Sequence, residues 1–337
     1  MFDKYLYALG RGVRGAKQAL DEARARETDP ARDARDVTPP DAAQSAPPSR
    51  PARPGPDIID ATLARAPLVL GKRALVMGIV NVTPDSLSDG GQFFDPAAAI
   101  AHALTLVREG ADILDIGGES TRPGAQPVDE AEELGRVIPV IRAIAAQTST
   151  PISIDTMKAN VARAAISAGA TILNDVWGFQ RDPEMARVAA ECGVHCVLMH
   201  NRAGDDPGAD MFAEVKAFLA RSAELALSAG IAREKIILDP GIGFGKTPAQ
   251  GYELIRRLGE LKSVLGFPLL LGVSRKRLIG AATGRTVASE RLAGSLAAAL
   301  YGAMRGVDIL RVHDVAAHVD AVKMLAAIDS AAAGKHS

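Results

Sequence analysis

Between residues 74 and 313, short apolar runs alternate with segments that place apolar residues at helical intervals. The eight runs cover residues 74–81, 112–117, 151–155, 171–175, 195–200, 235–239, 268–274 and 308–313. The spacing predicts helices over residues 96–109, 128–147, 158–168, 182–192, 211–229, 248–263, 287–305 and 314–328. Strands buried on both faces are almost continuously apolar, as these runs are, so the alternation predicts a parallel α/β architecture.

Nearly every apolar run ends in a polar or charged side chain. A doubly wound open sheet also alternates strands and helices, but eight units with chemistry spread over all of them favour a closed (β/α)8 TIM barrel. The C-terminal ends of barrel strands lie on one rim, where active sites are built. We expect that rim to carry Asn81, Asp115, Asp155, Asn174, His200, Asp239, Lys276, Arg311 and His313.

Residues 1–57 have a different character. Residues 1–24 place Phe2, Leu6 and Leu9 near one helical face, whereas residues 25–57 are rich in Pro, Ala and Arg. We therefore expect a disordered or weakly helical N-terminal extension, an amphipathic helix followed by a linker, and a barrel over residues 58–330. Docking of the helix on a membrane surface or a partner is an alternative to a weakly ordered leader.

Composition excludes several classes of function. Lys and Arg total 39 against 40 for Asp and Glu, and aromatic residues are 4%, which disfavours nucleic-acid binding. No apolar stretch reaches the roughly 18–20 residues of a membrane span, and the start lacks the apolar core of a secretory signal. We expect a cytoplasmic protein in which Cys192 and Cys196 are core thiols.

A glycine-rich turn follows the sixth run, from Asp239 to Thr247. Three residues separate Gly241 from Gly245, where a nucleotide-binding P-loop needs four, so this turn is not a P-loop. What remains is the carboxylate of Asp239 on the rim. Two other stretches, residues 81–91 and 117–124, are polar loops able to close over a substrate.

The candidate site combines both signs of charge. Asp155, Asn174 and Asp239 offer carboxylate and amide groups suited to a donor-rich heterocycle. Residues 274–277 follow the seventh strand, and residues 311–313 end the eighth. Both segments carry basic side chains, in the part of the barrel that often binds phosphate. We expect His200 to be structural, and the stripe Leu292, Leu296, Leu300 and Met304 to pack in the core.

The same segments resemble the dihydropteroate synthase family over about residues 70–325. The similar motifs are Ile79–Ser86, Asp115–Ala125, Ser153–Thr156, Asn174-Asp175, Leu198–His200, Asp239–Lys246, Ser274–Lys276 and Arg311–Asp314. The resemblance implies a transferase of folate biosynthesis. Such an enzyme joins 6-hydroxymethyl-7,8-dihydropterin pyrophosphate to p-aminobenzoate with Mg²⁺, is inhibited by sulfonamides and is commonly a homodimer.

The resemblance also implies a role for each matching residue. Asp155, Asn174, Asp239 and Lys276 would hold the pterin, and Asn81 would help to bind Mg²⁺. Pyrophosphate would be held by Arg311, His313 and Thr121. The p-aminobenzoate site would be bordered by Arg122, Pro123, Phe244, Ser274 and Arg275. No protein nucleophile is required, so we expect a dissociative, SN1-like substitution in which Lys276, Arg311, His313 and Asp155 are catalytic.

One position departs from the family, since Leu87 stands where the first loop usually carries Phe. This change puts affinity for p-aminobenzoate and sulfonamides in doubt. Two rival functions are considered. A pterin-binding methyltransferase module would need a corrinoid partner and no grip on pyrophosphate, and a non-enzymatic paralogue would bind the pterin without turnover.

Overall fold

The computed structural model describes residues 64–83, 95–120 and 126–333. The helix predicted over residues 1–24, the linker over 25–57, Leu87, and the greater part of the two loops expected to close lie outside these ranges. Within the described residues, no helix is both long and apolar enough to span a bilayer.

The described strands form one parallel sheet, in the order β6-β5-β4-β3-β2-β1-β8-β7. Their bounds are β1 (Leu75–Asn81), β2 (Ile113–Gly117), β3 (Ile152–Asp155), β4 (Ile172–Asp175), β5 (His195–Met199), β6 (Ile236–Asp239), β7 (Leu270–Leu271) and β8 (Ile309–Val312). A parallel bridge between Leu238 and Leu269, with Leu238 N donating to Pro268 O at 2.9 Å, joins the two ends of the sheet. The barrel predicted from the sequence is therefore confirmed.

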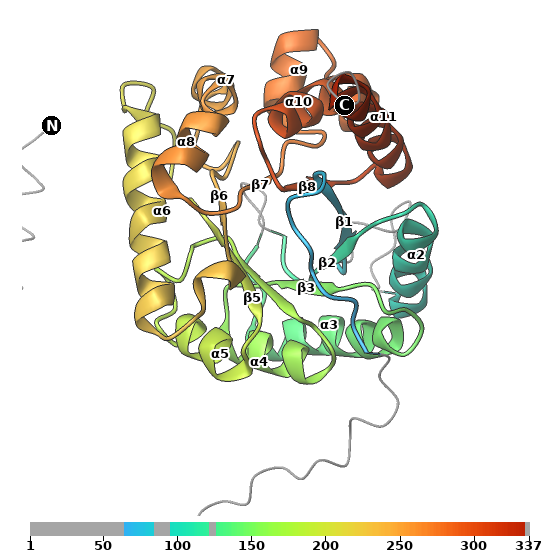
Figure 1. The fold of residues 1–337 in the computed structure, drawn as a ribbon. Coiled ribbons are helices and arrows are strands. Elements are labelled where there is room, and N and C mark those ends of the chain that lie inside the picture. The colour runs from blue at the N-terminus through green and yellow to red at the C-terminus, as the bar shows by residue number, and fades with distance from the viewer. Residues whose placement is uncertain (1–63, 84–94, 121–125, 334–337) are drawn as a thin grey trace, which may run out of the picture. The chain divides into compact units, whose positions relative to one another are not determined.

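Helices surround the strands, as Figure 1 shows. Their bounds are α2 (Pro96–Arg108), α3 (Glu130–Ala145), α4 (Ala159–Ser167), α5 (Glu184–Cys192), α6 (Met211–Ser228), α7 (Pro248–Arg256), α8 (Leu258–Leu265), α9 (Arg277–Thr283), α10 (Leu292–Met304) and α11 (Val315–Ala333). Several begin at side-chain caps: Asp129 accepts from Glu132 N, and Thr247 forms a capping box with Gln250. Such caps satisfy backbone N–H groups that the first helical turn leaves unpaired.

Two helix predictions need correction. The single helix expected over residues 248–263 is two helices, because Arg257 (φ −101°, ψ 14°) leaves the α-helical conformation and turns Leu258 and Leu261 into the core. The helix expected over 287–305 is α-helical only from Leu292, after a 3-10 turn (Ala288–Arg291). The short helix α9 was not expected.

The apolar stripe of α10 does not pack in the core as predicted. Leu292, Leu296 and Leu300 are half-buried, and Met304 is 71% exposed. The buried face of α10 consists instead of Ser295, Ala299 and Gly302. A Cβ on Gly302 would lie 2.5 Å from the Leu271 side chain, so α10 approaches β7 too closely for large residues on its inner face. The larger side chains therefore lie on a neighbouring, partly exposed face.

The half of the barrel interior nearer the N-terminal ends of the strands is filled by apolar side chains from seven strands: Met77, Ile113, Ile172, Val197, Ile237, Leu270 and Ile309. Leu68, Leu70 and Leu75 pack against this cluster from the N-terminal end of the strands. The interior is thus a closed floor, as expected for a packed barrel rather than a channel.

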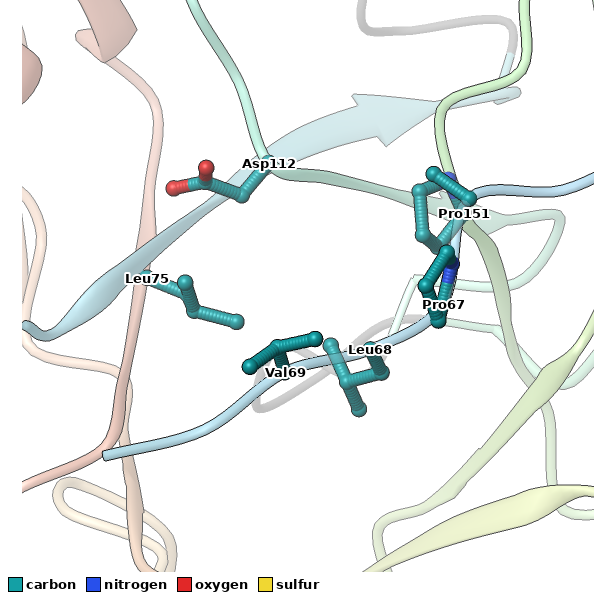
Figure 2. A pocket seen from close by; sticks show the side chains of 7 residues that line it. Pro67, Leu68, Val69, Leu75, Asp112 and Pro151 are labelled. Carbon is teal, nitrogen blue, oxygen red and sulfur yellow. The ribbon is translucent and has the colours of Figure 1, made fainter. Parts of the chain in front are cut away.

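A pocket of about 210 Å³ lies at the N-terminal end of the barrel. Figure 2 shows Leu68, Val69 and Leu75 there, together with Asp112 and two prolines. The Asp112 carboxylate is bound by both terminal nitrogens of Arg73 at 2.8 Å. A pocket with an apolar lining and a fully paired carboxylate offers little for chemistry.

The cysteine prediction is right for one residue and wrong for the other. Cys196 is buried within β5, but Cys192 ends α5 on the surface and is exposed. Cys192 continues the helical spacing of Met185, Val188 and Ala189, but it is the last residue of α5 and is exposed at the helix end.

Candidate active site

Six of the predicted site residues line one cavity at the C-terminal rim of the barrel. They are Asp155, Asn174, Asp239, Phe244, Lys276 and Arg311, joined by Val176, Met199 and Gly272. Each charged member lies at or just beyond the end of a strand, which is why residues up to 156 positions apart in sequence meet. The rim predicted from polar strand ends therefore exists as a physical site.

Arg311 crosses this cavity from β8. Its Nε donates to Asp115 Oδ2 at 2.6 Å, and its Nη2 donates to Asp155 Oδ2 at 2.8 Å. Asn174 Nδ2 also lies near both oxygens of Asp115, at 3.3 and 3.4 Å. Asp115 is completely buried, so it serves as an internal anchor for both the guanidinium and the amide.

Asp155 retains binding capacity that the described residues do not use. Its Oδ1 is buried and has no hydrogen-bond partner among them. Burial raises the pKa of Asp155; Arg311 opposes this shift, and the carboxyls of Asp115, Glu133 and Asp175 reinforce it. An unpartnered buried oxygen costs free energy in the isolated protein, so its retention indicates a ligand that donates a hydrogen bond there.

Asp239 and Lys276 form the other side of the cavity. Asp239 is 5% exposed, and its Oδ1 accepts from Gly241 N at 2.7 Å. Burial raises the pKa of Asp239, although Lys276 acts against that shift. The pKa of Lys276 is lowered to about 8 by burial, with Arg311 acting in the same direction and Asp239 against it. The two opposite charges therefore partly compensate each other within the site.

The glycine-rich turn after β6 places Phe244 at the cavity wall. Lys276 Nζ donates to Ile242 O at 2.5 Å and lies 4.7 Å from the centre of the Phe244 ring. The aromatic face and the ammonium attract each other, so the turn and Lys276 hold one another in place.

The remaining predicted residues lie beside the cavity or beyond the described ranges. Ser274 Oγ accepts from His313 N at 3.2 Å and lies 3.1 Å from His313 Nδ1. Arg275, with an unusual φ of 58°, pairs through its guanidinium with Asp314 instead of lining the cavity. Asn81 ends β1 on the same rim. Thr121, Arg122 and Pro123 fall outside the described residues.

Two residues of the site were not identified as functional from the sequence. Asp115 was recognised only as a rim residue, but it binds Arg311 directly. Lys246 was considered only as part of a turn that does not match a P-loop. It is 5% exposed, and its Nζ lies 2.8 Å from His200 Nδ1. The signal available in the sequence was a lysine placed directly after a glycine-rich turn that follows an apolar strand.

Residues 77–313, which include this barrel and its rim cavity, match the pterin-binding enzyme family. A dihydropteroate synthase of Clostridium beijerinckii is 48% identical over 256 residues, covering 76% of this chain and 94% of that protein. The chain therefore belongs to the dihydropteroate synthase family, a family of transferases in folate biosynthesis. This confirms the family and the enzyme class predicted from the sequence.

Solved structures agree with that assignment. Dihydropteroate synthase of Xanthomonas albilineans with 4-aminobenzoic acid is 50% identical and has a TM-score of 0.74, covering 76% of this chain and 93% of that one. The same enzyme in complex with 7,8-dihydropteroate is 49% identical with a TM-score of 0.70, covering 76% and 94%. These similarities extend over the barrel.

Proposed function

We propose that this chain condenses 6-hydroxymethyl-7,8-dihydropterin pyrophosphate with p-aminobenzoate, giving 7,8-dihydropteroate and pyrophosphate. The observation that carries the proposal is the single cavity in which Asp155 and Asp239 face Lys276 and Arg311. The carboxylates suit the N–H-rich edge of a pterin, and the cations suit a diphosphate.

The pterin is held by Asp155, Asn174 and Asp239, with Lys276 completing the pocket. The unpartnered Oδ1 of Asp155 supports this role, because a pterin N–H would supply the missing donor. Asn174 donates its amide hydrogens towards Asp115, which leaves its carbonyl oxygen as an acceptor for the heterocycle.

The pyrophosphate is held by Arg311 and His313, assisted by Thr121. A hydroxyl of Ser274 that accepts from His313 N can donate to His313 Nδ1, which orients the ring beside the cavity. Arg311 remains charged at all relevant pH values, so it can stabilise the leaving group throughout the reaction.

Asn81 would contribute to a Mg²⁺ site. Within the described ranges, no group of three or more His, Cys, Asp or Glu side chains is placed to hold a metal. A single side-chain oxygen from Asn81 fits Mg²⁺, because this ion is commonly bound through one or two protein oxygens, waters and substrate phosphates. When bound, the ion supplies positive charge to the phosphate oxygens.

The reaction is a dissociative, SN1-like substitution at the methylene carbon of the pterin. The bond to the pyrophosphate oxygen breaks first, which leaves positive charge on the pterin beside Asp155 and Asp239. The amine nitrogen of p-aminobenzoate then bonds to the carbon and loses a proton to water. Phe244, Ser274 and Arg275, together with Arg122 and Pro123, border the acceptor. Preplaced charges of both signs lower the barrier because they need no reorganisation as charge develops.

The protein works as a cytoplasmic homodimer, with the barrel of residues 58–330 as its catalytic domain. The partly exposed apolar face of α10 supports dimerisation, since Met304 on α10 and Met324 and Ile328 on α11 are 71%, 62% and 55% exposed. Figure 1 shows α10 and α11 next to each other. Large apolar side chains exposed on two neighbouring helices are a feature of interfaces between subunits.

A pyrophosphate-release assay with and without p-aminobenzoate and Mg²⁺ tests the proposal. Asp239→Ala and Lys276→Ala should abolish release that depends on p-aminobenzoate while leaving the circular dichroism spectrum unchanged. Glu224→Ala, at an exposed position on α6, is the control. Wild-type rates in either active-site variant would refute the proposed roles, and pterin binding without release would indicate a non-catalytic paralogue.

A further inference from the structure

The turn between β6 and α7 lies flat against the segment that follows β5. Gly241, Gly243 and Gly245 all have positive φ, at 64°, 85° and 58°. A Cβ on Gly241 would lie 1.9 Å from His200 O, and one on Gly245 would lie 2.7 Å from Arg202 O. Such close backbone contact leaves no room for side chains, so the path of the turn depends on its neighbours.

Two lysine side chains donate to carbonyls of this turn that lie two residues apart. Lys276 Nζ donates to Ile242 O at 2.5 Å, and Lys246 Nζ donates to Phe244 O at 2.9 Å. Lys276 belongs to the cavity, whereas Lys246 is not among the residues that line it. Lys246 therefore acts on the Phe244 backbone from outside the substrate pocket.

Lys246 is itself held by His200. Its Nζ lies 2.8 Å from His200 Nδ1, and burial lowers the pKa of His200 to about 3, with Lys246 acting in the same direction. The ring is therefore neutral, and Nδ1 accepts the hydrogen bond when its proton is on Nε2. That nitrogen faces Glu214 Oε1 at 3.6 Å, and Glu214 in turn pairs with Arg202 at 3.0 Å.

We propose that Lys246 is a positioning residue for the arylamine substrate: with His200 as its acceptor, it holds the Phe244 carbonyl and thereby fixes the Phe244 ring at the cavity wall. The inference rests on the proposed function, in which Phe244 borders p-aminobenzoate. Lys246 does not touch the reacting atoms. Its loss would loosen the Phe244 wall and leave Asp155 and Arg311, on other strands, in place.

The proposal predicts different effects on the KM for p-aminobenzoate and on the KM for the pterin substrate. Loss of Lys246 should weaken the acceptor site, because an aromatic wall that moves makes poorer contact with an arylamine. It should affect the pterin site less, because Asp155, Asn174 and Arg311 have no hydrogen bond with the turn among the described interactions. Asp239 and Lys276 do bond to the turn, but at Gly241 and Ile242 rather than at Phe244. A purely structural role would instead lower stability and affect both substrates alike.

The experiment compares four variants in the pyrophosphate-release assay. Lys246→Met removes the donors and keeps an unbranched side chain, and His200→Leu removes the acceptor. His200→Asn keeps an oxygen near the position of Nδ1 and should rescue the defect. Lys216→Met makes the same chemical change at an exposed position on α6 and is the matched control.

We expect Lys246→Met and His200→Leu to raise the KM for p-aminobenzoate roughly five- to tenfold, as befits one lost hydrogen bond at a buried carbonyl. The KM for the pterin substrate and kcat at saturation should stay within about twofold, and His200→Asn and Lys216→Met should resemble the wild type. Unchanged KM values in Lys246→Met would overturn the proposal, as would equal rises for both substrates with no rescue by His200→Asn. Absence of release that depends on p-aminobenzoate in the wild-type protein would instead refute the proposed function.

Discussion

Arg311 Nη2 donates to Asp155 Oδ2 at 2.8 Å across the mouth of the barrel, from β8 to β3. The same guanidinium is anchored closer to its stem, where Nε donates to the fully buried Asp115 at 2.6 Å. A ligand that engages Asp155 can thus compete for the outer bond while the inner bond keeps Arg311 in the site. Asp115 is completely buried, whereas Asp155 lines the cavity.

Replacing Asp115 with Asn should therefore lower kcat by about ten- to a hundredfold, because Arg311 loses the charged partner that places it for the leaving group. Steady-state kinetics measures the effect. Asp112→Asn makes the same substitution at the opposite end of the barrel, where Asp112 binds Arg73, and should leave kcat unchanged. Equal kcat values for the two variants would contradict the anchoring role.

Activity should decline on the alkaline side at an unusually low pH. Burial lowers the pKa of Lys276 to about 8, so this ammonium loses its proton above that pH and the site loses a positive charge. We expect kcat/KM for the pterin substrate to fall about tenfold per pH unit above this point. Any activity that remains in Lys276→Arg should show no such decline above pH 8. A wild-type profile that is flat to about pH 10 would show that the charge on Lys276 is not needed.

Lys246 makes a second pH-dependent prediction, this one on stability. Burial lowers its pKa to about 7 in the folded protein, from the ordinary lysine value of 10.5. Between these values the unfolded chain binds more protons, so the free energy of unfolding rises as pH increases from about 7 towards 10.5, and this dependence levels off below pH 7. The groups that face Lys246 are His200, Arg202, Glu214, Asp239 and Lys276.

The wild type should therefore gain about 2 kcal/mol relative to Lys246→Met between about pH 7 and pH 9, at up to roughly 1.4 kcal/mol per pH unit. Urea denaturation of both proteins at each pH measures the difference. Groups far from Lys246 are shared and cancel, whereas His200, Asp239 and Lys276 interact with Lys246 and contribute to the difference. Stability curves that run parallel for the two proteins would mean that the Lys246 pKa is not lowered.

Gly241→Ala should destabilise the barrel by about 2–4 kcal/mol and impair turnover, since the new Cβ would collide with His200 O at 1.9 Å. Gly284→Ala is the control for backbone conformation alone: Gly284 has a similar φ of 74°, but a Cβ added there would have no neighbour within 4 Å. It should cost about 1 kcal/mol. Similar denaturation midpoints for the two variants would argue against the close packing of the turn.

The proposed dimer surface can be tested with a charge. Met304→Glu, on the outward face of α10, should shift the protein from dimer to monomer in sedimentation velocity, because an interface core does not tolerate an unpaired carboxylate. Val69→Glu makes a similar change at another exposed apolar position and should leave the dimer intact. A dimer that survives Met304→Glu would move the interface elsewhere.

The strands were predictable from the sequence because strands buried on both faces carry an unbroken apolar signal that polar rim residues terminate. Each described strand lies within its predicted run, although β7 keeps only Leu270 and Leu271. Pro268 has no N–H, and Leu269 N donates to Asp308 Oδ2, which limits that strand. Six of the chemical groups expected on the rim or beside it meet in one cavity for the same reason.

Features that depend on distant neighbours were not predictable. The period of α10 shows that it is a helix but not which face is inward, and the close approach at Gly302 decides that. The partnership of Lys246 and His200 joins residues 46 positions apart, and neither residue has a local signature for it. The break at Arg257 likewise depends on packing rather than on a proline or glycine.

The solid apolar floor of the barrel has a consequence for timing. Because Met77, Ile237 and Ile309 help to close the N-terminal end of the barrel interior, both substrates and both products pass through the opening at the C-terminal rim. If the heterocycle occupies the deeper part of the cavity, as the proposed roles of Asp155, Asn174 and Asp239 imply, it must enter before the arylamine.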